Sequence, residues 1–258
     1  MNFETLKYER RDSAAILTLN RPDRHNAINS VMARELPAAW AEIDRDPQVR
    51  VAIVTGAGEK SLCTGFDVSD IASDTADVKS MGFTSLQCRV WKPVITAVNG
   101  MVCGGGLHFV ADSDLVIAAE QATFFDTHVN VGLIAGMEPI VLARKMSIEP
   151  LMRLSLVGRS DRMNARRAMQ LGIIGEVVAK ENLLSRALEL ARLIAENSPA
   201  ACARTKRALW DSLNMGLDDA REMGWKVIED YWTHPDTKEG ARAFAEKRKP
   251  SWARPEGK

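Results

Sequence analysis

The sequence has few cysteines, and none of them is spaced as in a redox or zinc motif. Its 258 residues include four, and no two of these are separated by only two residues. A chain of this length buries enough apolar surface to fold without disulfides, so we expect reduced thiols and a cytoplasmic location. Residues 1–5 do not begin a basic stretch with an apolar run behind it, and no secretory signal is expected.

An excess of charge of either sign is also missing. The 34 Lys and Arg residues balance 34 Asp and Glu residues. No overall basic field attracts nucleic acid or an acidic membrane surface, so neither is expected as a partner. One long segment without these four residue types, Val94 to Ala111, contains Asn99, His108 and four glycines. It fits a core strand, a glycine turn and the start of a buried helix better than a membrane span.

Several motifs that identify common enzymes are absent from the sequence. Residues 56–61 (GAGEKS) lack the spacing of a phosphate-binding Walker loop, and no GxGxxG dinucleotide fingerprint or GxSxG hydrolase elbow is present. The four histidines are His25, His108, His128 and His234, and no two are close enough for ordinary ligand spacing. We therefore expect no metal site.

Strand and helix patterns alternate through most of the chain. Residues 49–54, 94–98 and 115–119 are short apolar runs typical of buried strands, and Ser30 is a candidate N-cap for the helix that follows it. Beyond residue 181 the pattern is helical only, over 183–196, 200–213, 217–232 and 236–247. The sequence therefore predicts an α/β core over residues 1–195 and a helical region over 196–258.

A glycine-rich turn is the strongest local signal. Gly104, Gly105 and Gly106 follow a predicted strand and precede an apolar helical stretch. Glycine lets the backbone approach a ligand closely, and the start of a helix offers unpaired N–H groups. This geometry suits an anion, or an oxygen that becomes one during a reaction. A tight turn without any ligand explains the glycines alone equally well.

Together with its neighbours, this turn resembles the crotonase superfamily of enoyl-CoA hydratases and isomerases. Six segments match the superfamily's motifs in the same order along the chain, from residue 19 to residue 250. They are residues 19–29 (LNRPDRHNAIN), 51–58 (VAIVTGAG), 63–67 (CTGFD), 92–106 (KPVITAVNG, ending in GGG), 168–174 (AMQLGII) and 239–250 (EGARAFAEKRKP).

The resemblance implies a spiral core of repeated ββα turns and a helical C-terminal trimerisation region. Trimers of this superfamily often pair into hexamers, so a homotrimer or hexamer is expected. The implied substrate is an acyl-CoA thioester, which carries its own CoA, so no further cofactor is expected. By position, the backbone N–H groups of Phe66 and Gly105 would hold the thioester oxygen. Such donors suit chemistry that places negative charge on that oxygen.

Further contacts with CoA are implied for a set of residues spread along the chain. Two of them, Phe244 and Lys247, would reach the ligand of a neighbouring subunit. The set comprises Arg24, Ala27, Thr64, Phe244 and Lys247. Packing is the alternative role for Phe66, and a solvated surface is the alternative for the charged residues. Asp67 is expected to cap a short helix, and Cys103 to pack.

The proton-transferring positions depart from the superfamily's hydratases. There, one Glu lies two residues after the triple glycine and another twenty residues later, whereas this chain has His108 and His128. Histidine titrates near neutral pH, so both are candidate acids or bases, and the alternative is a pair of packed histidines. Glu138 is a further candidate or a carboxylate at a helix start. Asp126 either orients a histidine or caps a turn.

Three functions remain open from the sequence. The first is an acyl-CoA enzyme of the hydratase/isomerase type, with His108, His128 or Glu138 in place of the usual glutamates. The second is a hydrolase of the same superfamily that cleaves a C–C bond, as in a β-diketone, or a thioester. The third is a protein that binds acyl-CoA without catalysis.

Overall fold

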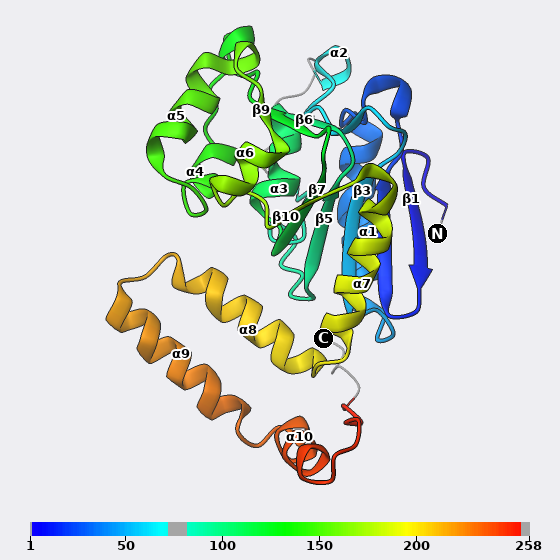
Figure 1. The fold of residues 1–258 in the computed structure, drawn as a ribbon, viewed down its shortest axis with the longest axis vertical. Coiled ribbons are helices and arrows are strands. Elements are labelled where there is room, and N and C mark those ends of the chain that lie inside the picture. Colours follow the sequence, from blue (N-terminus) through cyan, green and yellow to red (C-terminus); the bar gives the residue numbers. More distant parts are fainter. Residues whose placement is uncertain (1, 72–81, 254–258) are drawn as a thin grey trace.

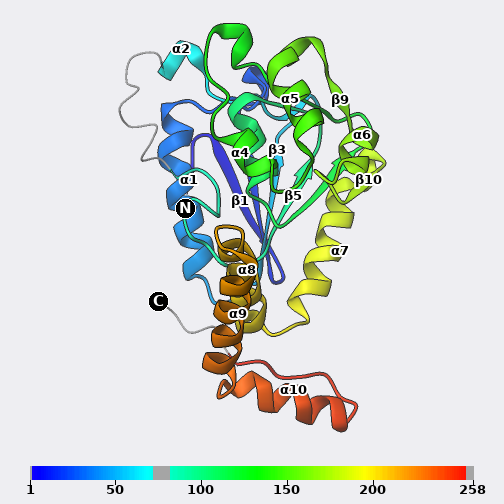
Figure 2. The same ribbon diagram turned by 90° about the vertical axis from the view of Figure 1, so that its left-hand side faces the viewer.

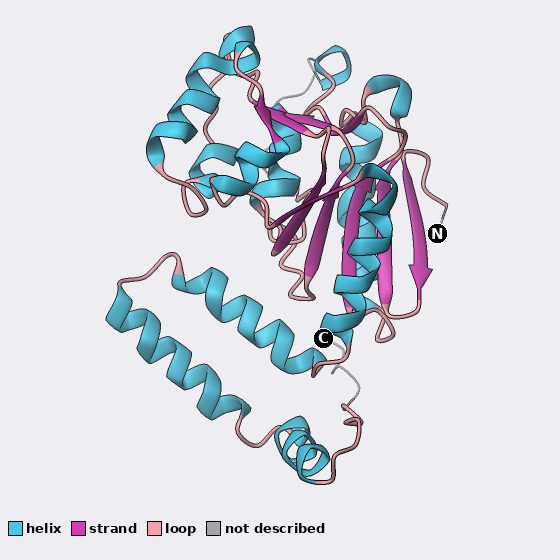
Figure 3. Cartoon of the chain, in the orientation of Figure 1, coloured by secondary structure: helices cyan, strands magenta, loops and turns pink. Residues whose placement is uncertain are grey.

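The computed structural model describes residues 2–71 and 82–253, and a six-stranded sheet forms their centre (Figures 1 and 3). The order across the sheet is β1-β2-β3-β5-β7-β10. β1 is antiparallel to β2, and every other neighbouring pair is parallel. The strands are β1 (Leu6–Arg11), β2 (Ala14–Leu19), β3 (Val51–Gly56), β5 (Val94–Val98), β7 (Leu115–Ala119) and β10 (Glu176–Val178).

A second, four-stranded sheet has the order β4-β6-β8-β9. Its strands are β4 (Ser61–Cys63), β6 (Met101–Cys103), β8 (Thr123–Phe125) and β9 (Met163–Asn164). The chain passes three times from the large sheet to the small one, from β3 to β4, from β5 to β6 and from β7 to β8. Helices α2 (Val68–Ile71), α3 (His108–Ala111) and α4 (Glu138–Leu142) follow these three passes. The expected α/β fold with repeated ββα turns is confirmed.

The central strands β2, β3 and β5 of the large sheet are buried on both faces, as is usual for parallel strands. Along β3, Ile53 belongs to the apolar cluster that includes α7 (Leu183–Ala195), whereas Val54 belongs to the cluster that includes α1 (Ser30–Arg45). Figure 2 shows these two helices on opposite sides of the sheet. Side chains alternate between the faces because a strand has a period of two residues. The sheet is therefore a rigid support for the loops at its edge.

The N-cap of α1 differs from the prediction. Asn29, not Ser30, has the extended backbone of a cap, and its side chain accepts a hydrogen bond of 3.0 Å from the backbone N–H of Met32. Ser30 already belongs to the helix. The prediction of Ser30 was one residue too late, because asparagine and serine are comparable caps and residue type alone does not separate Asn29 from Ser30.

The remaining helices form two groups. Helices α5 (Ile148–Val157) and α6 (Ala165–Gln170) lie beside the small sheet, whereas three others extend away from the large sheet (Figures 1 and 2). Those three are α8 (Pro199–Ser212), α9 (Leu217–Tyr231) and α10 (Pro235–Ala245). The proposed boundary after residue 195 lies between α7 and α8 and stays a prediction. Over residues 2–71 and 82–253, no helix has the length and apolar character to cross a membrane.

Candidate active site

Two backbone segments meet at the glycine turn that follows β6. A side chain at Gly106 would place its Cβ 2.3 Å from the carbonyl oxygen of Cys63, so only glycine fits there. Gly65 has a φ of +86°, and a Cβ on it would lie 2.8 Å from the backbone nitrogen of Gly105. This close approach requires glycine on both segments. It sets the backbone around Phe66 beside the backbone of Gly105.

The N–H groups of Phe66 and Gly105 lie on these two adjoining segments. Ile28 and Phe66 form an isolated parallel bridge, but its hydrogen bonds run from Ile28 N to Gly65 O at 2.8 Å and from Asp67 N to Ile28 O at 2.9 Å. The N–H of Phe66 therefore faces away from Ile28. Within the described ranges, no hydrogen bond between elements has either N–H as its donor. Both remain available to an oxygen from outside the chain.

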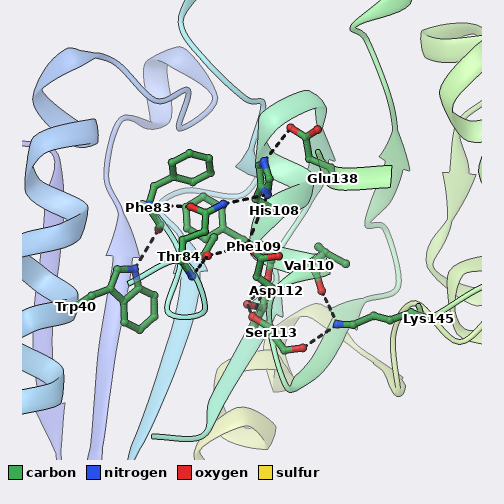
Figure 4. Close-up of polar contacts among 12 residues, drawn as sticks. Trp40, Phe83, Thr84, His108, Phe109, Val110, Asp112, Ser113, Glu138 and Lys145 are labelled. Carbon is green, nitrogen blue, oxygen red and sulfur yellow. Dashed lines mark hydrogen bonds and ion pairs between the residues drawn. The ribbon is translucent and has the colours of Figure 1, made fainter. Parts of the chain in front are cut away.

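His108 is the first residue of α3 and is buried, with 4% of its surface exposed. Its Nε2 lies 3.3 Å from Oε1 of Glu138 (Figure 4). The ring of Phe83 packs edge-on against the imidazole, with the ring centres 4.9 Å apart, and against Phe66 at 5.5 Å. These rings make one apolar wall that leads from the amides to the imidazole.

Glu138 lies at a helix start and also faces the two histidines. It begins α4 and is followed by Pro139, as a carboxylate at a helix start would be. Its side chain is nevertheless 4% exposed and directed toward His108 (Figure 4). The same Oε1 atom lies 4.0 Å from Nε2 of His128. One buried carboxylate oxygen thus faces both imidazoles.

His128 is held from the opposite side by a fully buried carboxylate. Oδ1 of Asp126 lies 2.8 Å from Nδ1 of His128. The same oxygen accepts a hydrogen bond of 2.7 Å from the backbone N–H of His128. The hydrogen bond to Asp126 raises the pKa of His128 above its ordinary 6.5, burial opposes the rise, and Glu138 adds to it. Burial would raise the pKa of Asp126, but the hydrogen bonds from His128 outweigh it and lower that pKa.

This contact also places the proton of the neutral imidazole. A carboxylate only accepts hydrogen bonds, so Nδ1 of His128 carries the hydrogen that lies between it and Asp126. Nε2 of the neutral ring then has a lone pair, which faces Glu138. The ring also lies beside the glycine turn, since a Cβ on Gly104 would be 3.9 Å from Cε1 of His128. The imidazole of His128 therefore lies beside the glycine turn, with its Nδ1 hydrogen held by Asp126.

Cys103 is packed in the interior of the protein, as expected. It is 5% exposed, and burial raises the pKa of its thiol to about 12. Such a thiol is not ionised near neutral pH and is not an activated nucleophile. No group of three or more His, Cys, Asp or Glu side chains in the described part of the chain is arranged to hold a metal ion.

Three of the residues expected near CoA lie on two adjacent segments, residues 22–28 and 63–67. Arg24 is exposed on a short 3₁₀ helix, Ala27 is buried, and Thr64 donates to the carbonyl oxygen of His25 at 3.4 Å. Asp67 accepts a hydrogen bond from the Ser69 backbone N–H at 3.3 Å, as expected for a cap, and another from the Ser69 hydroxyl at 2.6 Å. It also pairs with Arg21 at 3.0 Å. The two segments are thus held together by ionic and backbone contacts.

Phe244 and Lys247 are not brought to this site within one chain. Phe244 is on α10 and is 89% exposed, and Lys247 follows the end of that helix. Figure 1 shows α10 at the lower end of the molecule, apart from α3.

Sequence reasoning missed Phe83, Gln87 and Asp112, which surround His108. Phe83 and Gln87 belong to no motif, and only the fold brings them to α3. Asp112 was recognisable in principle, because it follows His108 by four residues and so lies on the same side of a helix. Its Oδ2 lies 3.7 Å from Nδ1 of His108.

Comparisons with known proteins agree with the fold and the motifs. The family model for enoyl-CoA hydratase/isomerase matches residues 9–255. (E)-Benzylidenesuccinyl-CoA hydratase of Thauera aromatica is 34% identical over 250 residues, which cover 92% of this chain and 94% of that protein. Carnitinyl-CoA dehydratase of Escherichia coli strain K12 is 33% identical over 258 residues, covering 96% and 98%.

A solved structure extends the likeness to three dimensions. The enoyl-CoA hydratase/isomerase from Mycobacterium paratuberculosis has a TM-score of 0.92 at 39% identity, covering 98% of this chain and 100% of that one. The chain therefore belongs to the enoyl-CoA hydratase/isomerase family, within the crotonase superfamily.

Proposed function

We propose that this protein is an acyl-CoA lyase that adds water to, or removes it from, a thioester conjugated with a double bond. The observation that carries the proposal is the Asp126-supported His128 beside two unengaged backbone amides. The hydratase and dehydratase named above support this type of reaction. CoA arrives with the substrate, and no other cofactor is needed.

The amides of Phe66 and Gly105 stabilise charge on the thioester oxygen. Attack of water at the β carbon moves electron density through the α carbon onto that oxygen. Preorganised N–H donors aimed at the oxygen lower the barrier, since removing one such donor costs about 2.7–4 kcal/mol in comparable sites. Backbone donors do this without placing a charged side chain in an apolar pocket.

Proton transfer falls to the two imidazoles and Glu138. His128 accepts a proton from water at its unprotonated Nε2 as the oxygen joins the β carbon. Glu138, hydrogen-bonded to His108, delivers a proton to the α carbon. The 4.0 Å between Nε2 of His128 and Oε1 of Glu138 is short enough for the proton to return through one water molecule. Dehydration reverses each step.

A second candidate rests on the same Asp126–His128 pair. A histidine supported by a carboxylate also activates water against a carbonyl carbon. The same amides would then hold the oxygen of a β-diketone while a C–C bond breaks. Hydrolysis of a thioester would use the same groups.

The proposal extends to the assembly. Arg24, Ala27 and Thr64 contact the CoA bound to their own subunit, and Phe244 and Lys247 contact the CoA of a neighbour. The 89% exposure of Phe244, far from its own site, supports a homotrimer in which each site is completed by the next subunit. A hexamer of two such trimers satisfies the same contacts.

A substrate panel distinguishes these functions. Purified protein is assayed with short and aryl-substituted enoyl-CoA thioesters, with saturated acyl-CoA thioesters and with β-diketones, and the products are identified by mass. We expect a mass gain of one water on an enoyl-CoA, with the CoA retained. C–C cleavage of a diketone or release of free CoA would establish the hydrolase instead. Binding of the thioesters without turnover of any of them would leave only a binding protein.

His128→Asn tests the assigned base in the same assay, with Glu149→Gln as the control. Glu149 is an exposed carboxylate in the first turn of α5. We expect most of the turnover to be lost in His128→Asn and to be retained in Glu149→Gln.

A further inference from the structure

The orientation of the Gln87 amide is fixed by its own turn. Its Oε1 accepts a hydrogen bond of 3.0 Å from the backbone N–H of Phe83. A backbone N–H only donates, so the side-chain atom facing it must be the oxygen. The other side of this turn is anchored as well, since the indole N–H of the buried Trp40 donates to the carbonyl oxygen of Phe83 at 3.1 Å (Figure 4).

The amide nitrogen of Gln87 consequently faces His108. Its Nε2 lies 3.4 Å from Nδ1 of the imidazole. An amide NH₂ group donates and does not accept, so Nδ1 of the neutral ring must be the acceptor and carries no hydrogen. The single hydrogen of neutral His108 is then on Nε2, directed at Oε1 of Glu138 3.3 Å away.

We infer that Gln87 is a positioning residue that keeps neutral His108 protonated on Nε2. His128 has the opposite tautomer, because Asp126 holds its hydrogen on Nδ1. The two Nε2 atoms that face Glu138 therefore differ, one bearing a hydrogen and the other a lone pair. A site with one donor and one acceptor has a direction for proton transfer, which two identical imidazoles would lack.

Other groups around His108 are compatible with this tautomer. Oδ2 of Asp112 lies 3.7 Å from Nδ1, beyond a direct hydrogen bond, and accepts instead from the Thr84 hydroxyl at 2.7 Å. Lys145 lies on the far side of α3, where its Nζ donates to the carbonyl oxygens of Val110 and Ser113 at 3.0 and 2.8 Å (Figure 4).

The catalytic consequence rests on the proposed function, but the tautomers do not, and they are measured without substrate. The full-length protein is labelled with ¹⁵N-histidine, and long-range ¹H–¹⁵N correlations are recorded above the pH at which the imidazoles titrate. The sequence has only four histidines, and His108→Asn and His128→Asn variants assign the two relevant rings. We expect an unprotonated Nδ1 in His108 and a protonated Nδ1 in His128. A protonated Nδ1 in His108 would overturn the inference.

Two variants test the role of Gln87 itself. Gln87→Glu keeps an oxygen for the Phe83 N–H but offers His108 an acceptor, so the Nδ1 signal should move to the protonated position. Gln87→Met removes the donor without adding charge and should give a mixture of tautomers. A Nδ1 signal that stays unprotonated in Gln87→Glu, with melting temperature and circular dichroism unchanged, would show that Gln87 does not set the tautomer.

Activity then separates this inference from the proposed function. If the tautomers are as expected but no enoyl-CoA is hydrated, the positioning role stands and the function fails. If hydration is observed while Gln87→Glu changes neither the tautomer nor the pH profile, the function stands and the positioning role fails.

Discussion

Asp126 accepts two hydrogen bonds from His128, one from its backbone N–H at 2.7 Å and one from its ring Nδ1 at 2.8 Å. The two residues are separated by only one position, so the carboxylate closes a small turn and orients the imidazole at the same time. Capping and orientation, which the sequence offered as alternatives for Asp126, are both present. The pair gives His128 a fixed tautomer before any substrate binds.

Removing the base should abolish most of the activity without unfolding the protein. His128→Gln deletes the group proposed to accept the proton from water, and kcat/KM should fall roughly 10²–10⁴-fold, the usual contribution of a positioned acid or base. Because His128 is partly exposed, the melting temperature of the variant should differ little from that of the wild type. Steady-state kinetics with the best enoyl-CoA of the panel measures the loss. A change of less than threefold would mean that His128 is a packed histidine.

The pH profile should carry the signature of Asp126. Neutral His128 is the active form, so kcat/KM should rise with pH through its pKa, which the contact with Asp126 raises above 6.5. In Asp126→Asn that contribution disappears, and the acid limb should move to lower pH as the maximal rate drops. Rates measured between about pH 5 and 9 locate the limb. An acid limb at the same pH in both proteins would assign it to another group.

Displacing the amides should impair turnover through geometry alone. A Cβ at Gly65 would come within 2.8 Å of the Gly105 nitrogen, so Gly65→Ala should lower kcat by about 10²–10³, the cost of one lost oxyanion donor. Gly132→Ala is the matched control, because Gly132 also has a positive φ of +77° but meets nothing within 4 Å. It carries a similar backbone strain and should keep its kcat. Equal losses in both variants would point to strain rather than to the amides.

The C-terminal helices should hold subunits together. Trp225 lies on α9 and is 60% exposed, and Trp232 directly follows this helix and is 71% exposed. Such exposure is unusual for large aromatic side chains outside an interface. The double variant Trp225→Glu/Trp232→Glu should lower the mass measured by light scattering from three or six chains to one. Leu193→Glu, an exposed apolar position on α7, should leave the mass unchanged. A wild-type protein of one chain mass would contradict the assembly.

The sequence predicted the backbone elements of this site better than the contacts of its titratable side chains. The glycine turn and the loop around Phe66 are recognisable because only glycine permits their close approach, which leaves a pattern in the sequence. Strands such as 94–98 and 115–119 have the predicted bounds because short apolar runs between breakers are distinctive. Gln87 gave no such signal, since its contact with His108 depends on a turn anchored by Trp40 in another helix.

Glu138 illustrates the same limit from the other direction. Its position before Pro139 suggested a helix start, and the structure agrees. Its approach to both imidazoles depends on how α4 is placed against α3, which no local pattern encodes. Contacts between separate elements decide the role of such a residue.

A crystal structure with a bound, slowly reacting enoyl-CoA analogue is the most direct test of the central claim. The account predicts the thioester oxygen within about 3.1 Å of the backbone nitrogens of both Phe66 and Gly105, with Nε2 of His128 facing the β carbon. A thioester oxygen bound elsewhere, with these two N–H groups donating to acceptors of the protein itself, would contradict it.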